Sequence, residues 1–268
     1  VLTRRSLLVW LKDYLQKDAY KSIQILNKQV NFFIPNHLTN SRVDTFFIKE
    51  PETIEWINSF ENSNNLIFWD IGANIGLYSI YNALKNSDSL TVSFEPSTSN
   101  LRVLSRNISI NDLENKIQIV SLPLTNKENQ FLMMKEGEFS EGGALNSFGE
   151  SWNYAGNDFK SEMNYKLLGT TINYLLDHKI LEVPDHIKID VDGIEHLILE
   201  GADKYLRHKK IKSLSIEINE NFQEQYDNIL SIMKKNDFEI LHKKHNEAMF
   251  NEECHYVTFN YVFIRKEV

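Results

Sequence analysis

Two short turns in the middle of the chain carry residue types that could bind a charged, ribose-bearing ligand. The first, at residues 70–76, has the form D-x-G-x-N-x-G, and the second, at residues 190–195, has the form D-x-D-x-x-E. Gly72 and Gly76 allow a tight reversal and a close approach of backbone to ligand. Glu95 follows at the distance where an acid at the end of a second strand commonly accepts both hydrogens of a ribose diol. The spacing therefore predicts a site for a ribose-bearing cofactor.

The acids around these turns favour one class of cofactor. A pyrophosphate binds helix N-terminal amides and is repelled by nearby carboxylates, whereas a sulfonium with a free α-ammonium group is attracted to them. Asp70 and Asp190 therefore fit S-adenosylmethionine (SAM) better than NAD(P), and the first turn is not the G-x-G-x-x-G of dinucleotide sites. The glycines are not followed by a Walker-type Lys-Ser/Thr pair, which disfavours ATP.

The elements that must position these turns predict a parallel sheet covered on both faces. Apolar strands are expected at residues 66–70, 90–95, 117–122, 186–191 and 211–218, with helices at about 77–84, 97–110, 171–177, 194–206 and 222–235. Near-continuous apolar strands separated by amphipathic helices are typical of an α/β fold. Two final strands, at residues 238–241 and 256–265, lack an intervening helix and predict an antiparallel hairpin at one sheet edge.

Residues 1–60 are expected to form an extension of the domain that spans residues 61–268. Leucines at helical spacing between residues 7 and 15 predict an N-terminal helix. The stretches 23–34 and 42–48 flank turn-prone residues, and this pattern predicts a β-hairpin.

The stretch from about residue 124 to 169 interrupts the strand–helix alternation and carries six of the ten glycines. It is expected to be a β-rich insertion with long loops, which in compact domains commonly act as lids or binding elements. Because Trp152 and Tyr154 lie nearby and aromatic rings offer a flat apolar surface, we expect it to close over a sugar-like acceptor. The candidate acceptor-binding residues in this stretch are Gly142, Gly143, Ala144 and Ser147.

The composition argues against several partner classes. Hydrophobic residues make up 42% and charged residues 25% of the chain, which suits one large soluble domain with at most a small appendage. The net charge of -8 disfavours a nucleic-acid partner, since binding a phosphate backbone needs a clustered basic face. No segment approaches the roughly 20 apolar residues of a membrane span. The single cysteine, Cys254, fits a reducing cytosol and is expected to fill space near a C-terminal strand. We therefore expect a cytoplasmic protein.

Several blocks of the sequence together resemble one enzyme family. They are FWDIGANIGLYS at residues 68–79, FEP at 94–96 with Asn100 and Asn107 in the next helix, and IKIDVDGIE at 187–195. These blocks are similar to those of FkbM-type SAM-dependent methyltransferases. Residues 50–57 and 142–149 also resemble blocks of a subgroup of that family, and the resemblance extends from about residue 31 to 265.

The resemblance implies a Rossmann-like class I methyltransferase core with a mostly parallel, seven-stranded sheet. Such enzymes typically move a methyl group from SAM to a hydroxyl of a sugar or a secondary metabolite. By position, the residues implied to contact the cofactor are Asp70, Gly72, Ala73, Asn74 and Gly76 at the methionine and ribose, Glu95 at the ribose, and Pro96 and Leu122 at the adenine. Glu50 and Thr53 are further candidates, although with Pro51 they also make a good helix start.

A sugar hydroxyl is a poor nucleophile, so we expect a general base within hydrogen-bond reach of the acceptor. The candidate bases are Asp190, Glu195, His196, His242 and His245, of which His245 also borders the expected acceptor pocket. Glu195 could instead stabilise a helix N-terminus through the helix dipole. The acids could also hold a divalent cation, but they lack the spacing of a calcium hand, and no metal is expected.

Two alternative functions remain open at this stage. One is a SAM-binding module without catalysis, and the other is a methyltransferase that acts on a nucleic acid or a peptide. The acidic balance and the absence of an Asn/Asp-Pro-Pro-Tyr/Phe motif count against the second. We predict a cytosolic SAM-dependent O-methyltransferase for a sugar or glycan acceptor, with its oligomeric state left open.

Overall fold

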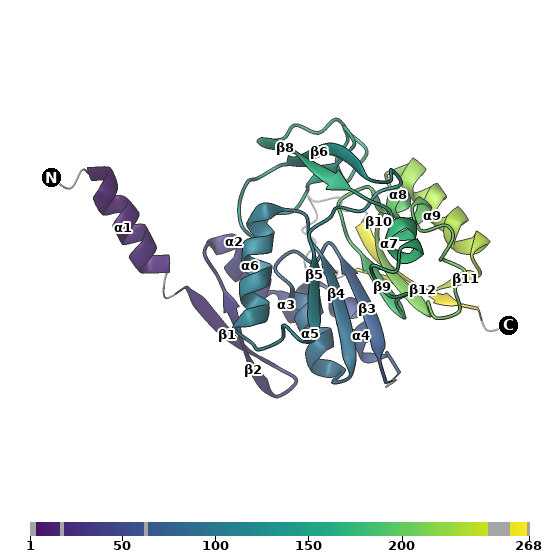
Figure 1. Ribbon diagram of the computed structural model, residues 1–268, viewed down its shortest axis with the longest axis horizontal. Coiled ribbons are helices and arrows are strands. Elements are labelled where there is room, and N and C mark those ends of the chain that lie inside the picture. Colours follow the sequence, from purple (N-terminus) through teal and green to yellow (C-terminus); the bar gives the residue numbers. More distant parts are fainter. Residues whose placement is uncertain (1–3, 17–18, 62–63, 246–257, 267–268) are drawn as a thin grey trace.

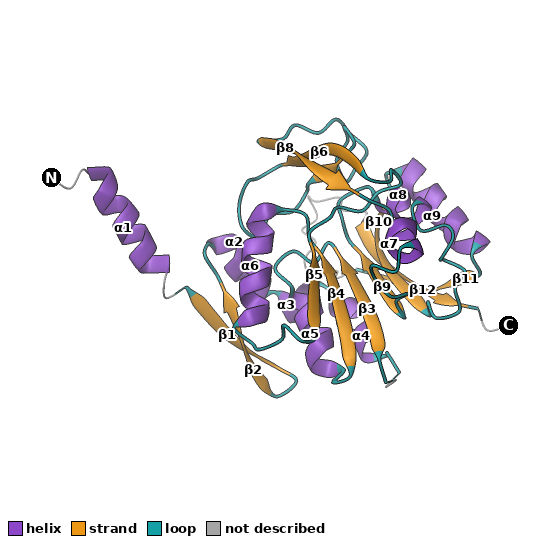
Figure 2. Cartoon of the chain, in the orientation of Figure 1, coloured by secondary structure: helices purple, strands orange, loops and turns teal. Residues whose placement is uncertain are grey.

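Apolar runs in the sequence form the strands of one large sheet, which helices cover on both faces (Figures 1 and 2). The computed structural model describes residues 4–16, 19–61, 64–245 and 258–266. The helices are α1 (Arg4–Gln16), α2 (His37–Asp44), α3 (Phe46–Lys49), α4 (Pro51–Asn58), α5 (Leu77–Lys85), α6 (Thr98–Ser109), α7 (Ile172–Asp177), α8 (Glu195–Glu200) and α9 (Gln223–Lys235). The strands are β1 (Tyr20–Ile25), β2 (Lys28–Phe33), β3 (Leu66–Ile71), β4 (Ser89–Phe94), β5 (Ile117–Val120), β6 (Gln130–Glu136), β7 (Ser147–Phe148), β8 (Met163–Gly169), β9 (His186–Ile189), β10 (Ser213–Asn219), β11 (Phe238–Lys244) and β12 (Thr258–Arg265).

Within the described residues, seven strands form the large sheet in the order β11-β12-β10-β9-β3-β4-β5. Strands β10, β9, β3, β4 and β5 run parallel to one another, whereas β12 is antiparallel to both β10 and β11. This arrangement confirms the predicted Rossmann-like sheet with a C-terminal antiparallel hairpin. The chain order reverses between β3 and β9, and in open α/β sheets ligands bind in the crevice beyond such a reversal.

The two faces of the sheet bury different sets of side chains, because neighbouring residues of a strand point to opposite faces. On one face, Phe68 packs in a cluster with Trp56 of α4 and Leu104 of α6. On the other face, Trp69 packs in a cluster with Ile198 of α8. Strand β3 is therefore buried on both sides, which explains its unbroken apolar sequence.

The predicted N-terminal hairpin exists, but its strands and its neighbours differ from the prediction. Strands β1 and β2 pair across Leu26 and Asn27, whose positive φ angles of 49° and 62° form the turn inside the stretch expected to be one strand. The second predicted strand, at residues 42–48, was wrong, because these residues belong to α2 and α3. Asn36 caps α2, and its side chain accepts a hydrogen bond from the backbone N–H of Thr39.

Helix α1 confirms the predicted N-terminal helix, but its apolar side chains are exposed. Leu8, Trp10 and Leu15 have exposed fractions of 62%, 60% and 62%. Figure 1 shows α1 standing apart from the sheets. The rest of the extension packs onto the sheet, since Phe32 and Trp56 share a buried cluster with the large sheet. The boundary at residue 60 therefore stays a prediction.

Within the stretch expected to be an insertion, residues of β6, β7 and β8 form a separate three-stranded antiparallel sheet in the order β7-β6-β8. It lies beyond the carboxyl ends of the parallel strands (Figure 1). Among the described helices, none is long and apolar enough to cross a membrane. Cys254 lies outside the described residues, so its expected place near a strand stays a prediction.

Candidate active site

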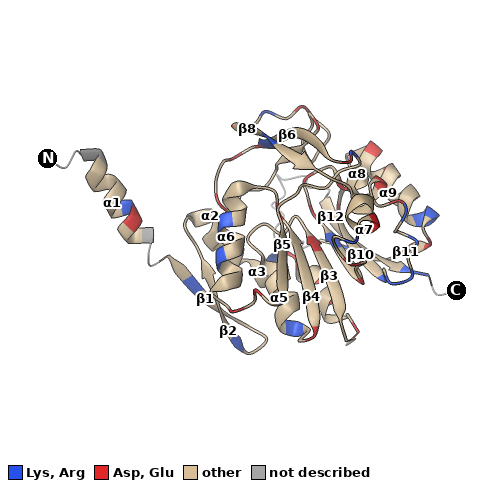
Figure 3. Cartoon of the chain, viewed as in Figure 1, with Lys and Arg blue, Asp and Glu red and all other residues tan. Residues whose placement is uncertain are grey.

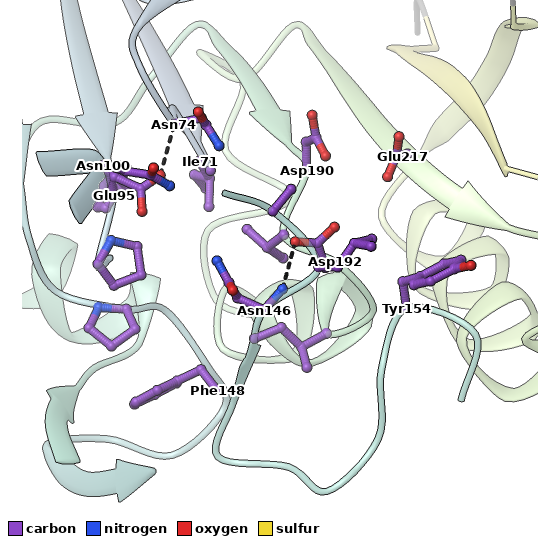
Figure 4. A pocket seen from close by; sticks show the side chains of 18 of the residues that line it. Ile71, Asn74, Glu95, Asn100, Asn146, Phe148, Tyr154, Asp190, Asp192 and Glu217 are labelled. Carbon is purple, nitrogen blue, oxygen red and sulfur yellow. Dashed lines mark hydrogen bonds between the residues drawn. The ribbon is translucent and has the colours of Figure 1, made fainter. Parts of the chain in front are cut away.

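A cavity of about 420 Å³ lies at the carboxyl ends of the parallel strands. Its walls come from the turns after β3, β4, β5 and β9, from β10, from the insertion and from the N-terminal helices. Figure 4 shows Glu95 at one end of the cavity and Glu217 with Tyr154 at the other. Asp190 and Asp192 lie between these two ends.

The turn after β3 depends on Gly72, which has a φ of +85°. A Cβ atom at this position would lie 1.8 Å from the backbone carbonyl oxygen of Asp190. The Gly72 N–H also donates to the carbonyl of Phe94 at 3.0 Å. Only glycine fits here, and the turn is held between the ends of β4 and β9.

Glu95 is buried, and each of its carboxylate oxygens accepts a backbone hydrogen bond. Oε2 accepts from the N–H of Asn74 at 2.7 Å, and Oε1 accepts from the N–H of Ser97 at 2.8 Å. Burial raises the pKa of Glu95 to about 7, although these hydrogen bonds oppose the rise. Because a carboxylate oxygen has two lone pairs, Glu95 can still accept hydrogen bonds from a ligand in the cavity.

Residues 138–147, which we call the 138–147 loop, are fastened over the Glu95 end. The carbonyl of Gly143 accepts hydrogen bonds from the side-chain amides of Asn74 and Asn100, at 2.8 and 3.1 Å. The N–H of Gly142 donates to Asn100 Oδ1 at 2.8 Å, and its carbonyl accepts from Arg42 Nε at 2.6 Å. This segment is therefore closed over the cavity.

The same end of the cavity has an apolar lining that suits a flat heterocycle. This lining consists of Pro96, Leu122, Pro123, Leu124, Met134, Phe148, Ile194 and Ile198. Met134 and Phe148 come from the insertion, so the insertion builds part of this wall. Asn74 Oδ1 is also buried without a donor among the described residues. An apolar slot beside a carboxylate and an unpaired amide oxygen fits an adenosine.

Asp190 carries a lasting negative charge in the middle of the cavity. Lys188, which is only 2% exposed, donates from Nζ to Asp190 Oδ2 at 2.6 Å. Burial alone would raise the pKa of Asp190, but Lys188 and Lys49 outweigh it and hold this pKa below its usual range. The buried ammonium of Lys188 in turn has a raised pKa, because Asp190 and Glu50 outweigh its burial.

Asp192 links the turn after β9 to the insertion. Its Oδ2 accepts a hydrogen bond from the backbone N–H of Asn146 at 3.1 Å (Figure 4). Burial and the negative charge of Asp190 raise its pKa to about 6. The 138–147 loop is therefore anchored at both the Glu95 end and the centre of the cavity.

Glu217 lines the far end of the cavity from the middle of β10. None of the described residues donates a hydrogen bond to its carboxylate or forms an ion pair with it. Burial and the negative charges of Asp190 and Glu50 raise the pKa of Glu217 well above its ordinary value.

The sequence of the chain matches a family model. The model, described as the methyltransferase FkbM domain, covers residues 70–240. The chain belongs to the FkbM methyltransferase family. The resemblance seen in the sequence motifs is thereby confirmed, and the FkbM domain is a SAM-dependent methyltransferase by family.

Individual relatives are more distant. Methyltransferase sdnD of Sordaria araneosa is 29% identical over 184 residues, which cover 61% of this chain and 71% of that protein. The fibrillarin pre-rRNA processing protein of Methanococcus jannaschii has a similar structure, with a TM-score of 0.50, 13% identity, and coverage of 94% of this chain and 84% of that chain. An rRNA methylase of Streptococcus thermophilus has a TM-score of 0.48 and 11% identity, over 81% of this chain and 95% of that chain. At 13% identity, the likeness to the fibrillarin structure supports the fold alone.

The cavity of the FkbM domain brings together most of the residues expected from the sequence. The expected residues that line it are Glu50, Gly72, Asn74, Glu95, Pro96, Leu122, Gly143, Ala144, Ser147, Asp190 and His245. Ala73 lines a smaller neighbouring cavity of about 50 Å³. Gly142 is not among the cavity-lining residues; it lies against Thr39, and its N–H donates to Asn100 Oδ1.

Three residues expected to contact the cofactor lie behind the cavity wall. Asp70 is 1% exposed, and its Oδ2 accepts a hydrogen bond from Ser79 Oγ at 2.5 Å. Gly76 precedes α5 with a φ of +90°, and a Cβ there would lie 2.6 Å from Leu104 Cδ1. Thr53 is fully buried beneath Glu50. These residues shape and support the turns rather than line the cavity.

Two expected bases also lie outside the cavity. Glu195 is 1% exposed, and its carboxylate accepts hydrogen bonds from the backbone N–H groups of Val191 and Gly193 and from the side chain of Gln225. Burial raises its pKa to about 8. His196 is buried with its ring 6.1 Å from that of Phe222. Glu195 therefore holds the turn before α8 in place, whereas His196 packs beside Phe222 with its Nδ1 buried and without a hydrogen-bond partner among the described residues.

Sequence reasoning missed Glu217, and it named neither Asp192 nor Asn100 as a candidate site residue. A single acid inside the apolar run SLSIEIN was a readable signal for Glu217, because a strand buried on both faces rarely carries an unpaired charge. His242, another candidate base, is not among the cavity-lining residues. In the part of the chain that the structure describes, no three His, Cys, Asp or Glu residues are grouped to hold a metal ion.

Proposed function

We propose that the FkbM domain transfers a methyl group from SAM to a hydroxyl of a sugar or of a sugar-containing metabolite. The observation that carries this proposal is a cavity with two chemically different ends. The Glu95 end combines a carboxylate with an apolar slot, and the Glu217 end is polar. One end suits a nucleoside cofactor, and the other suits an acceptor rich in hydroxyl groups.

At the cofactor end, Glu95 would accept hydrogen bonds from the ribose hydroxyls, and the slot formed with Pro96 and Leu122 would hold the adenine. Gly72 and Asn74 would adjoin the methionine part, with Glu50 and Asp190 facing its positive charges. Asp190 suits this role because its pKa is held low. When bound, SAM supplies an electrophilic methyl group.

At the acceptor end, the lining offers many hydrogen-bonding groups and one aromatic ring. Asn260 Nδ2 donates to Glu52 Oε1 at 2.8 Å, and Thr258 and His245 line the same cavity. The ring of Tyr154 offers a face on which a sugar can pack. Ala144, Ser147 and the backbone of Gly143 would contact the acceptor from the 138–147 loop.

A nucleic-acid acceptor fits the charges of the cavity poorly. Carboxylates outnumber cations in its lining, with Glu50, Glu52, Asp190, Asp192 and Glu217 against Arg42 and Lys49. A phosphate backbone needs clustered Lys and Arg for affinity. Figure 3 shows Lys and Arg of the described residues interspersed with Asp and Glu over many elements.

An assay for S-adenosylhomocysteine (SAH) tests the proposed function. The full chain is incubated with SAM and a panel of free sugars, nucleotide sugars and glycosides, with a transfer RNA and a peptide library as comparison acceptors. We expect SAH to form with one hydroxyl-bearing sugar class, together with a mass gain of one methyl group on the acceptor. Turnover confined to RNA or peptide, or SAM binding without turnover on any acceptor, would contradict the proposal.

A further inference from the structure

Glu217 combines three features that no other acid of the cavity shares. It projects from β10 into the end of the cavity opposite Glu95 (Figure 4). All the remaining residues of β10 are buried. Its carboxylate has no hydrogen-bond donor among the described residues. It also lies beyond Asp190 as seen from Glu95, on the side where an acceptor would approach the methionine end of the cofactor.

Both acidic and basic groups surround Glu217. The acids are Asp190 and Asp192, in the turn after β9, and Glu50, between α3 and α4. The basic residues are Lys49 at the end of α3, Arg42 of α2 and His245, which follows β11. Lys49 is engaged by Glu50, with Nζ 3.1 Å from Oε1. Arg42 is engaged by the carbonyl of Gly142 at 2.6 Å. The cations near Glu217 therefore already have partners of their own.

We propose that Glu217 is the proton acceptor for the acceptor hydroxyl, and that a positive charge arriving in the cavity with the cofactor brings its carboxylate into the ionised form. This proposal rests on the proposed function, methyl transfer to a hydroxyl. The structure assigns the role to Glu217 because its carboxylate faces the acceptor end and is not committed to another residue of the described chain.

The step balances in atoms and charge. The acceptor oxygen forms the new C–O bond to the methyl carbon, the electron pair of the broken C–S bond stays on sulfur, and the hydroxyl proton passes to the Glu217 carboxylate. The positive charge of the sulfonium and the negative charge of Glu217 are both lost, so the products are neutral at these two positions. Glu217 then returns its proton to solvent.

The other candidate bases suit this role less well. Asp190 is paired with Lys188 at 2.6 Å, and its pKa is held low, so it is a weak proton acceptor. Glu195 and His196 do not line the cavity. In contrast, burial and the negative charges of Asp190 and Glu50 raise the pKa of Glu217, which makes it a stronger proton acceptor than Asp190.

Proton release on cofactor binding tests the proposal without any acceptor. SAM and SAH share the adenosine and amino acid groups, but only SAM carries the sulfonium charge. Binding of each is measured by calorimetry at neutral pH in phosphate and in Tris, whose ionisation enthalpies differ. We expect the full chain to release up to about one more proton with SAM than with SAH, because an added cation lowers the pKa of a carboxyl group.

Variants assign that proton. Glu217→Gln should still bind SAH, which shows that the cavity is formed, and should lose most of the SAM-minus-SAH proton difference. Glu220→Gln is the matched control, because Glu220 lies just past the end of β10 and is paired with Lys243 and Tyr261. The proposal is overturned if Glu217→Gln keeps the SAM-minus-SAH difference in protons released, or if Asp192→Asn loses it instead. It is also overturned if the unmodified chain shows no such difference.

Once an acceptor is found, kinetics provide a second test. Glu217→Gln should lower kcat by at least about 100-fold and should weaken the binding of SAM more than that of SAH, because the ionised carboxylate favours the sulfonium. Glu217→Asp should retain part of the activity. An unchanged kcat and pH profile in Glu217→Gln would overturn the proposal. If no sugar is methylated, the proposed function fails, whereas the proton-release result still decides whether Glu217 responds to the cofactor charge.

Discussion

Asp190 and Glu217 are two carboxylates of one cavity whose surroundings move their pKa values in opposite directions. Lys188 holds the pKa of Asp190 low, whereas burial and Asp190 itself raise that of Glu217. Pairs of acids with separated pKa values are a common basis for dividing chemical roles in a site. In the proposed reaction, Asp190 keeps a constant charge and Glu217 exchanges a proton.

The role of Glu95 can be tested through affinity and pH. Glu95→Ala removes the proposed ribose acceptor, and we expect at least a tenfold weaker Kd for SAM by calorimetry, or about 1.4 kcal/mol. Because the pKa of Glu95 is raised to about 7, protonation below that pH should remove acceptor capacity. Affinity for SAM and SAH should therefore fall together as the pH drops from 8 to 6. Undiminished binding by Glu95→Ala would refute the assignment.

The pair formed by the buried Lys188 and the cavity-lining Asp190 predicts a non-additive effect on stability. Lys188→Met leaves the Asp190 carboxylate without its cation, and because this carboxylate is 25% exposed we expect a loss below the about 3–5 kcal/mol of a fully buried pair. The double variant Lys188→Met with Asp190→Asn removes both charges and should recover much of this loss. Urea unfolding of the single and double variants measures the coupling, and simple additivity would show that the pair contributes nothing specific.

The sequence identified the charged turns at the residue scale but not which side chains reach the cavity. Glu195 and His196 follow Asp190 closely in the chain, yet the turn directs them into the protein beside Gln225 and Phe222. Linear proximity could not reveal this, because a tight turn with a positive φ at Asp192 changes the direction of successive side chains.

At the scale of elements, the 138–147 loop connects the insertion to both cofactor turns. Asn100 of α6 contributes two of its anchoring hydrogen bonds, one to the backbone of Gly142 and one to that of Gly143. We therefore expect the loop to release these contacts when a ligand of the size of SAM enters or leaves the Glu95 end. Its opening is expected to control the rate of cofactor exchange.

Asn100→Ala should loosen the 138–147 loop. We expect faster amide hydrogen exchange in that loop and a several-fold higher dissociation rate of SAH. The N–H of Gly142 loses its partner, and the carbonyl of Gly143 keeps only the hydrogen bond from Asn74. Ser105→Ala, on an exposed position of the same helix, serves as the control. Unchanged exchange in the loop of Asn100→Ala would argue that other contacts alone keep it closed.

The order of strands and helices in the large sheet was predictable from the sequence because its apolar runs are long and periodic. The structure of the N-terminal segment was less predictable. Phe46, Phe47 and Ile48 are strand-favouring residue types, yet they lie in and around a short helix. The capping signal of Asn36 and Thr39 was present in the sequence and predicts a helix start. Tertiary packing of Phe46 against Tyr78 and Tyr81 then outweighs local propensity.

At the scale of the whole molecule, the exposed apolar side chains of α1 contrast with the buried ones of α4. Leu8 and Trp10 are 62% and 60% exposed, whereas Trp56 is 3% exposed and donates to Ser213 Oγ. The N-terminal extension therefore has two parts. Helix α1 buries few of its side chains, whereas the segment that contains α4 belongs to the core.

Removing residues 1–18 tests this division. We expect the shortened chain to keep its thermal midpoint and its affinity for SAH, since little buried surface is lost, and to remain in solution at higher concentration. A parallel deletion of residues 1–60 should fail to fold, because it exposes the sheet face that Trp56 covers. A large fall in the midpoint of the first variant would show that α1 stabilises the core.

The close contact between Gly72 and Asp190 restricts how this scaffold can be recombined. The two turns come from opposite halves of the sheet, yet 1.8 Å would separate a Cβ at one from the carbonyl of the other. A loop grafted from a relative would have to arrive together with its counterpart, since each is shaped to the other. In a chimera, residues 70–76 and 190–195 therefore behave as a single exchangeable unit.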